Sequence, residues 1–197
     1  MAKVLIVEDE SIVAKDIQNK LEDLDHDVVG IVSAGEKVIQ AVRDTNPDLV
    51  LMDIRLEGEM DGIQASEELK QFFDLPVVFL SSYSNVNTLK RAKIAEPYGY
   101  LLKPYEDREL SVAIDLAIYK HSVEKRVKEE KRRYEEILIS MPESIVTTDP
   151  RGKIIFMNPE AEKLFGCKAD EAIGQPIYRI IDVQNSSVED IIEIYIR

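Results

Sequence analysis

The chain has 197 residues, of which 45% are hydrophobic and 32% charged, and its formal net charge is −13. The length exceeds the usual single-domain size of about 100–150 residues, so we expect one full domain and a further segment. The acidic charge argues against an extended nucleic-acid surface, which needs clustered Lys and Arg, and suits a protein that gathers a divalent cation among carboxylates.

Two absences from the sequence bear on its compartment. Cys167 is the single cysteine, which excludes an intramolecular disulfide and a cysteine-rich metal cluster. The N-terminal sequence MAKVLIVEDE lacks the basic segment and apolar core of a signal peptide, and no stretch approaches the roughly 20 apolar residues of a membrane span. We therefore expect a cytoplasmic protein without membrane contact.

Short apolar runs alternate with amphipathic segments from the N-terminus onward. The apolar runs predict strands at residues 4–7, 28–32, 49–52, 76–81 and 99–102. The segments between them predict helices that begin near residue 12, at a capping box of Ser33 and Glu36, and near residues 62, 85 and 106. This alternation predicts an α/β fold with a doubly wound, five-stranded parallel sheet and helices on both faces.

Polar side chains stand where four of these strands end. They are Glu8, Asp9, Asp53, Ser81 and Lys103. Each alone is unremarkable, because an acidic pair after a strand is more often a solvated turn and a Lys-Pro is usually a helix entrance. Their coincidence is informative, because the functional crevice of such a fold lies beyond the carboxyl ends of its strands.

Three neighbouring carboxylates cannot all stay ionised cheaply without a cation, and Mg²⁺ prefers such oxygen ligands. We expect Asp9 and Asp53 to bind Mg²⁺ directly with the backbone carbonyl of Arg55, while Glu8 holds a bound water. A carboxylate that attacks phosphorus forms an acyl phosphate, and the metal offsets its charge.

Two further groups complete this chemistry. The Lys103 ammonium would pair with one phosphoryl oxygen, and the Ser81 hydroxyl would donate to another.

Four segments resemble the motifs of response-regulator receiver domains, in the right order and spacing over about residues 1–120: KVLIVEDE, VLMDIRL, PVVFLSSY and YLLKPY. The resemblance implies a flavodoxin-like sheet, phosphorylation by a histidine kinase, and these roles: Glu8 and Asp9 as the acidic pair, Asp53 as phosphoacceptor, Ser81 as switch hydroxyl, Tyr100 as switch aromatic and Lys103 as the lysine. Ser82 and Arg55 would flank the phosphate and affect its lifetime.

The rival from another class is an aspartyl phosphatase or mutase on a related fold. Those enzymes share an Asp-x-Asp motif whose second Asp is the general acid. The corresponding residue here is Arg55, which disfavours the enzyme and predicts a phosphoacceptor switch.

A long helix is expected after the fifth strand, because no Gly or Pro occurs from Tyr105 until Pro142. Its stretch at 121–141 would be a linker that joins a homodimer through an apolar stripe, although charged residues in the seam weaken it. The stripe comprises Val123, Val127, Tyr134 and Ile137. The alternative is that it folds back within one chain. We interpret its basic run as a solvated face rather than a nucleic-acid site, and His121 as a surface residue.

The segment at 142–197 has a different pattern. SIVTTD and KIIFMN predict a hairpin around PRG, and NPEAEKLFG predicts a helix that ends at Gly166. The stretch resembles the start of PAS sensor domains, and SVEDIIEIYIR resembles their long helix at most. The domain is therefore either truncated or degenerate. It could be a cofactor sensor or a dimerising spacer; we favour the spacer, since no histidine follows His121.

These patterns predict a receiver at 1–120, a helical linker at 121–141 and a partial PAS-like domain at 142–197. The expected function is that of a two-component response regulator. Its output would run through a downstream protein partner and could feed transcription control by that route. The chain itself is not expected to bind specific DNA. The alternative is the N-terminal part of a hybrid receiver–PAS sensor protein whose kinase or other effector is missing here.

Overall fold

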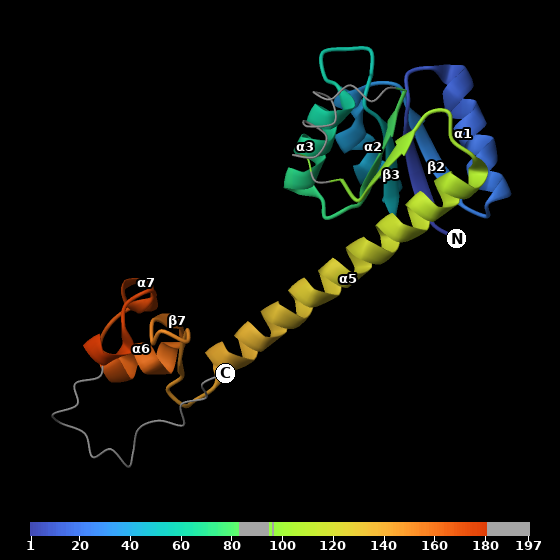
Figure 1. Ribbon diagram of the computed structural model, residues 1–197. Coiled ribbons are helices and arrows are strands. Elements are labelled where there is room, and N and C mark those ends of the chain that lie inside the picture. The colour runs from blue at the N-terminus through green and yellow to red at the C-terminus, as the bar shows by residue number, and fades with distance from the viewer. Residues whose placement is uncertain (83–94, 96, 181–197) are drawn as a thin grey trace. The chain divides into compact units, whose positions relative to one another are not determined.

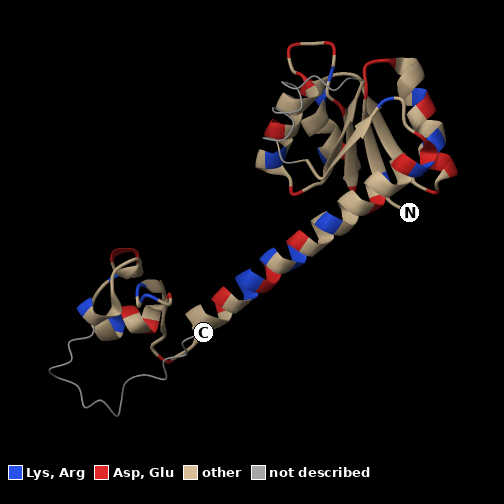
Figure 2. Cartoon of the chain, in the orientation of Figure 1, with Lys and Arg blue, Asp and Glu red and all other residues tan. Residues whose placement is uncertain are grey.

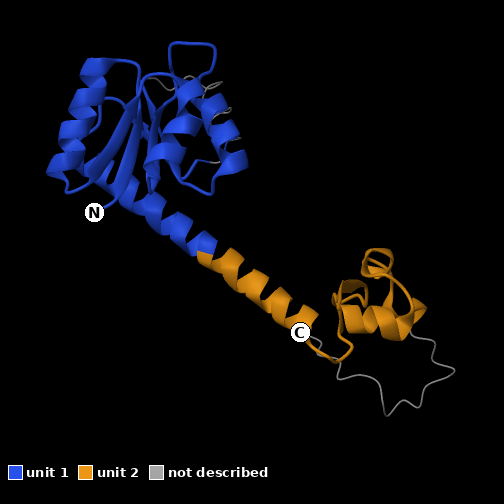
Figure 3. Ribbon diagram, turned by 180° about the vertical axis from the view of Figure 1, so that it is seen from behind, with its two compact units in different colours: residues 1–125 blue, residues 126–197 orange. Residues whose placement is uncertain are grey.

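The computed structural model of the chain describes residues 1–82, 95 and 97–180. It divides into two compact units, residues 1–125 and 126–197, which are coloured separately in Figure 3.

The first unit contains the predicted five-stranded parallel sheet. Its strands are β1 (Lys3–Val7), β2 (Asp27–Val32), β3 (Leu49–Asp53), β4 (Val77–Ser81) and β5 (Gly99–Leu102), in the order β2-β1-β3-β4-β5. Every residue of β3 and β4 is buried, as the continuous apolar runs in their sequences predict. The predicted fold class is confirmed, and each strand end lies within one residue of its expected position.

Helices cover both faces of this sheet (Figure 1). On one face, α1 (Ser11–Asp23) and the start of α5 (Asp107–Ser140) pack against the strands through Ile17, Leu21, Leu110, Ile114 and Ala117. On the other face, α2 (Val38–Thr45) and α3 (Gly62–Phe72) contribute Val38, Val42, Ile63, Ala65 and Leu69. The helix predicted near residues 85–95 lies outside the described residues.

The predicted capping box of Ser33 and Glu36 is wrong. A short 3-10 turn, η1 (Gly35–Lys37), precedes α2, and no side chain caps either element. The Glu36 carboxylate instead accepts hydrogen bonds from the backbone N–H groups of Glu59 and Met60, both at 2.9 Å. Two bonds to a distant loop replace the one bond that Glu36 would make within a capping box.

The capping box of this unit lies at the start of α3. The Asp61 side chain accepts from the Gln64 backbone N–H at 2.9 Å, and the Gln64 side chain accepts from the Asp61 N–H at 3.0 Å. This pairing fixes where α3 begins, immediately beside the end of β3.

Helix α5 is continuous over 34 residues, which confirms the predicted long helix. Its surface carries charges of both signs (Figure 2), and exposed pairs such as Arg132 with Glu136 at 3.4 Å follow i,i+4 spacing. Among the described residues, none of the helices combines the length and apolarity needed to cross a bilayer.

The second unit contains the predicted hairpin, with β6 (Val146–Thr148) antiparallel to β7 (Ile154–Met157). Helix α6 (Pro159–Phe165) follows and ends at Gly166, whose φ of 68° suits glycine, as the sequence predicts. Helix α7 (Ala169–Ala172) and a 3-10 turn, η2 (Ile177–Arg179), complete the described part. The small core consists of Ile154, Met157, Ala161 and Ala172. The stretch SVEDIIEIYIR lies outside the described residues.

Asn158 ties this hairpin to the end of α5. Its side chain is fully buried and its Oδ1 accepts from the N–H groups of Ile145 (2.9 Å) and Ala161 (3.0 Å). Its Nδ2 donates to the carbonyls of Glu143 (2.8 Å) and Leu138 (3.2 Å), and Leu138 lies in the last turn of α5. One amide thus serves the N-terminus of α6 and the C-terminus of α5.

Candidate functional site

The site lies at the carboxyl edge of the sheet, where the parallel strands bring their ends together. Glu8 follows β1, Asp53 is the last residue of β3, Ser81 is the last of β4 and Lys103 follows β5. Register pairs Asp53 with Leu80 and Ser81 with Leu102, so the ends of the neighbouring strands are level. The structure therefore brings the predicted residues to one edge of the sheet.

Lys103 is the centre of this cluster. Its ammonium lies 2.5 Å from Glu8 Oε2 and also donates to Asp53 Oδ2. The two carboxylate side chains are 1% and 6% exposed, and that of Lys103 is 16% exposed. The backbone holds the lysine in place, because its N–H donates to the Ser81 carbonyl at 2.7 Å. A buried ion pair of this kind is maintained by charge pairing on both sides of the ammonium.

The second oxygen of Asp53 is also held. Its Oδ1 accepts from the Arg55 backbone N–H at 2.8 Å, while the Arg55 side chain is exposed. The Asp53 carboxylate is therefore fixed through both oxygens at the end of its strand, with one oxygen on an ammonium and the other on an amide.

Asp9 does not join the other two carboxylates. Its Oδ2 accepts from the Glu57 backbone N–H at 3.2 Å, in the loop that follows β3. Among the described residues, no three carboxylate, histidine or cysteine side chains converge as metal ligands would, so the predicted convergence is only partial. The physical reason is that Lys103 supplies the positive charge between Glu8 and Asp53, which leaves Asp9 to bind the loop.

Gly62 belongs to the site, although no sequence signal singled it out. Its N–H donates to the Ile54 carbonyl at 3.0 Å, which brings the start of α3 against the end of β3. A Cβ at this position would lie 1.9 Å from the Asp53 carbonyl oxygen and 2.9 Å from its carbonyl carbon. Only glycine allows this approach of two backbones behind the Asp53 carboxylate.

Burial decides the electrostatics of the cluster. Desolvation, together with the nearby Asp53 carboxylate, raises the pKa of Glu8 to about 7, although the bond to Lys103 opposes it. Burial acts to lower the pKa of Lys103, but its hydrogen bonds to Asp53 and Glu8 outweigh this and raise that pKa above its usual value. The cluster thus has two carboxylates for a single ammonium and is short of positive charge at neutral pH.

This shortage predicts a pH dependence of stability in metal-free buffer. Glu8 binds its proton more tightly when folded (pKa about 7) than at its ordinary value of 4.5. The folded state therefore holds the extra proton, and the free energy of unfolding falls as pH rises between these two values. The fall should be at most a few kcal/mol, since each pKa unit corresponds to about 1.4 kcal/mol.

Chemical denaturation across this pH range measures the effect. Glu8→Gln, which cannot titrate there, should give a flatter profile, while Glu22→Gln on the exposed side of α1 should keep the wild-type slope. A wild-type profile as flat as that of Glu8→Gln would contradict the assignment.

The remaining predicted residues differ in their surroundings. Ser81 is 5% exposed, and Ser82 is exposed beside it. Tyr100 is half-buried against the core cluster of α2 and α3. Its hydroxyl oxygen is buried and has no hydrogen-bond partner within the described part of the chain.

The interpretation of His121 as a surface residue is wrong. Its side chain is 15% exposed, its Nε2 lies 3.2 Å from Asp74 Oδ1, and its ring meets Tyr98 edge-on with centroids 5.3 Å apart. The error has a plain cause: the turn of α5 that carries His121 still packs against the sheet, and the charge run around it masks this.

Comparison with known families finds two matches within the chain. The response regulator receiver domain matches residues 4–115, and the PAS fold matches residues 132–197. The first match covers more than half of the 197 residues.

Similar proteins match the first unit. The transcriptional regulatory protein PdtaR of Mycobacterium tuberculosis is 33% identical over 116 residues, which are 59% of this chain and 56% of PdtaR. The phyllosphere-induced regulator PhyR of Methylorubrum extorquens is 28% identical over 118 residues, 59% of this chain and 43% of PhyR. The chain thus spans about half the length of the curated relatives it matches.

Two solved structures are similar over the same region. The signal receiver domain of a modulated diguanylate cyclase from Desulfovibrio desulfuricans is 38% identical with a TM-score of 0.60, over 63% of this chain and 98% of that domain. The N-terminal domain of a response regulator/sensory box/GGDEF three-domain protein from Carboxydothermus hydrogenoformans is 33% identical with a TM-score of 0.57. The match covers 62% of this chain and 98% of that domain.

Proposed function

The chain belongs to the response regulator receiver family, and from this membership we propose that it is a phosphorylation-dependent switch whose phosphoacceptor is Asp53. An Asp53 carboxylate oxygen attacks the phosphorus of a kinase phosphohistidine. The new P–O bond forms as the P–N bond breaks, and the histidine nitrogen leaves with the bonding electrons. The observation that carries the proposal is the double hold on Asp53, which is 4% exposed and fixed by Lys103 and the Arg55 N–H.

We propose Mg²⁺ as the cofactor, because the residues present fit a hard cation. Glu8 and Asp53 share a single ammonium, and Asp9 directly follows Glu8 at the same edge of the sheet, although its carboxylate binds the Glu57 N–H and would have to turn to join them. Asp9, Asp53 and the backbone carbonyl of Arg55 would hold the ion, with Glu8 acting through water. When bound, it offsets the negative charge that gathers between a carboxylate and a phosphoryl group.

The other site residues have proposed roles around the phosphoryl group. The Lys103 ammonium pairs with a phosphoryl oxygen, and the buried Ser81 hydroxyl donates to another. Ser82 and Arg55, both exposed, flank the group and affect its lifetime. Tyr100 is the switch aromatic; this role is supported by its buried hydroxyl, which has no hydrogen-bond partner among residues 1–82, 95 and 97–180 and would gain one by rearranging.

We propose that the second unit is a partial PAS-like spacer, with domains at 1–120, 121–141 and 142–197. The output runs through a protein partner, without specific DNA binding by this polypeptide, whose net charge is −13. The alternative is the N-terminal part of a hybrid receiver–PAS protein. The Carboxydothermus protein, a response regulator/sensory box/GGDEF three-domain protein, is an example of a receiver joined to further domains and favours this alternative.

The function is tested by incubating the whole chain with acetyl phosphate and Mg²⁺. We expect the mass of one phosphoryl group to be added. Hydroxylamine should remove this group, as it does from an acyl phosphate. The proposal is refuted if neither acetyl phosphate nor a phosphorylated histidine kinase adds a phosphoryl group to the chain.

We also propose that the chain is a homodimer joined partly through α5. Val127, Tyr134 and Ile137 are 59%, 67% and 43% exposed within one chain, and Val123 is half-buried. Burying this stripe against a second copy at ~25 cal/mol/Å² supplies a few kcal/mol, which association costs partly offset. Val127→Glu should therefore weaken self-association at least about tenfold, the equivalent of 1.4 kcal/mol.

Sedimentation equilibrium measures this dimer with and without a phosphoryl-group analogue. Arg132→Glu is the matched control, because it breaks only an exposed ion pair on another side of the helix. A wild type that stays monomeric at tens of micromolar in both states would exclude the dimer and favour a stripe folded back within one chain.

A further inference from the structure

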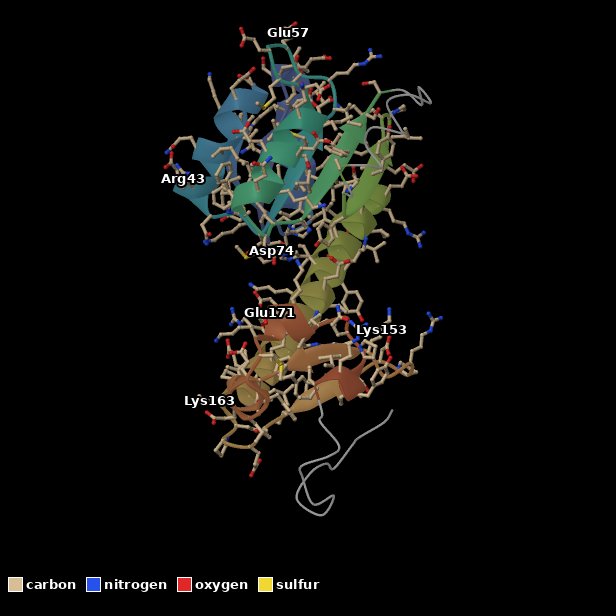
Figure 4. The ribbon with its side chains drawn as sticks, turned by 90° about the vertical axis from the view of Figure 1, so that its left-hand side faces the viewer. Arg43, Glu57, Asp74, Lys153, Lys163 and Glu171 are labelled. Atoms are coloured by element: carbon tan, nitrogen blue, oxygen red, sulfur yellow. The ribbon has the colours of Figure 1, made fainter. Side chains whose placement is uncertain are left out.

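Strand β5 connects two distinct sites. Its carboxyl end leads into Lys103, whose ammonium holds Glu8 and Asp53. Its amino end is preceded by Tyr98, which lies against the turn of α5 that carries Lys120, His121 and Glu124. Figure 4 shows that Glu57, beside the site, and Asp74, beside His121, lie at opposite ends of the first unit. Four residues of extended chain thus separate the two ends of this connection.

Tyr98 makes three contacts with α5. Its hydroxyl donates to Glu124 Oε2 at 2.8 Å, its ring meets His121 edge-on, and the Lys120 ammonium lies 5.3 Å from the ring centroid. A hydrogen bond to a charged acceptor, an aromatic pair and a cation–π contact each stabilise the arrangement modestly. Together they attach this turn of α5 to the start of β5.

The turn has a second attachment and space beside it. His121 Nε2 lies 3.2 Å from Oδ1 of Asp74, a residue of the loop that joins α3 to β4. A pocket of about 490 Å³ adjoins this contact, lined by His121, Asp74, Phe73, Ile118 and Lys125 among others. Open space therefore lies beside His121 on this side of the turn.

Tyr98 lies on a different face from the proposed switch aromatic. Its side chain packs with the core cluster of α1 and α5, whereas Tyr100 packs with that of α2 and α3. The Tyr98 backbone is anchored as well, since its N–H donates to the Val77 carbonyl at 2.9 Å. Strand β5 thus contacts α5 on this face in two places: Leu101 shares the core cluster of Leu110 and Ile114, and Tyr98 reaches the later turn that carries Glu124.

We propose that Tyr98 is a positioning residue that transmits the state of the Asp53 site along β5 to the turn of α5 at 120–124. The proposal rests on the proposed function. A phosphoryl group on Asp53 adds negative charge beside Lys103, so the ammonium shifts from Glu8 toward the phosphoryl oxygens. The strand moves with its lysine, and the Tyr98 hydroxyl carries that movement to Glu124, where α5 leaves the sheet.

The test is amide hydrogen exchange of residues 118–125 in the full chain, with and without acetyl phosphate and Mg²⁺. Wild type should show a phosphorylation-dependent change in exchange rate. Tyr98→Phe keeps the ring and removes only the hydroxyl, and it should reduce that change at least about threefold while accepting the phosphoryl group equally well. Glu124→Gln should have the same effect, and the double variant should add nothing further.

The matched control is Tyr119→Phe, because Tyr119 lies on the same helix and is 67% exposed. It should respond like wild type. A purely structural role for Tyr98 would shift the basal exchange rate of the variant but leave its phosphorylation-dependent change intact, and that result overturns the proposal. A wild type that is phosphorylated without any response at 118–125 also overturns it, and leaves the proposed function standing.

A second arm needs no phosphorylation. Asp53→Asn removes one of the two charges that hold Lys103, so it should alter exchange at 118–125 in the unphosphorylated chain. The same substitution should have little effect at 118–125 in the Tyr98→Phe background. If the chain accepts no phosphoryl group, the proposed function fails, and this arm still decides the coupling: equal effects of Asp53→Asn in both backgrounds reject it.

Discussion

Replacing Asp53 by asparagine should abolish phosphoryl transfer to the chain. The amide oxygen carries no full negative charge and is a far weaker nucleophile than the carboxylate, so the P–O bond cannot form at a useful rate. The fold should persist, because Lys103 keeps its bond to Glu8 and the Arg55 N–H keeps an acceptor at the same place. Intact-mass measurement after incubation with acetyl phosphate and Mg²⁺ reads the result directly.

The matched control for this variant is Asp44→Asn. Asp44 is an exposed carboxylate on α2 whose side chain accepts from Gln40 at 2.8 Å. Its loss removes one charge far from the site, so labelling should continue at the wild-type level. Undiminished labelling of Asp53→Asn, with Asp44→Asn also labelled, would place the phosphoacceptor elsewhere.

Gly62→Ala should strongly destabilise the first unit. The added methyl would lie 1.9 Å from the Asp53 carbonyl oxygen, and the obstacle is backbone rather than a movable side chain. Either β3 or α3 must shift, and overpacking of this severity costs about 3 kcal/mol or more of the free energy of unfolding. Because the shift occurs directly behind Asp53, phosphoryl transfer should fall as well, even where the variant remains folded.

Gly30→Ala provides the comparison for Gly62→Ala. Its methyl would lie 3.1 Å from Leu5 Cδ1 and 3.7 Å from Thr45 Cγ2, both of them ends of side chains that can adjust. Chemical denaturation of the two variants should therefore show a much larger loss for Gly62→Ala. Equal losses, or a Gly62→Ala variant as stable as wild type, would mean that the two backbones are further apart than described.

Apolar runs predicted the architecture because the central strands β1, β3 and β4 are buried along almost their whole length. Continuous apolar runs such as 49–52 leave little choice of element, and their regular alternation with helices predicts a parallel sheet. The same argument predicted that Asp53, Ser81 and Lys103 would meet, since parallel strands end at one edge. The lack of Gly and Pro between Tyr105 and Pro142 likewise predicted the continuity of α5.

Contacts between distant segments were beyond the same reasoning. Glu36 fitted a local capping box, yet its carboxylate binds the loop near Glu59, which no short-range pattern reveals. The role of Gly62 depends on how closely α3 approaches β3, and that of His121 on where α5 leaves the sheet. Such features follow from packing, because a side chain's partner is fixed only once the elements are placed.

The phosphoacceptor can be identified chemically in the wild-type chain. An aspartyl phosphate is reduced by borohydride to homoserine, whereas phosphoserine and phosphohistidine are not, so the reaction marks the modified carboxylate. After acetyl phosphate and Mg²⁺ treatment, reduction and peptide mass spectrometry, homoserine should appear at position 53 alone. Homoserine at another aspartate, with Asp53 recovered unchanged, would contradict the account.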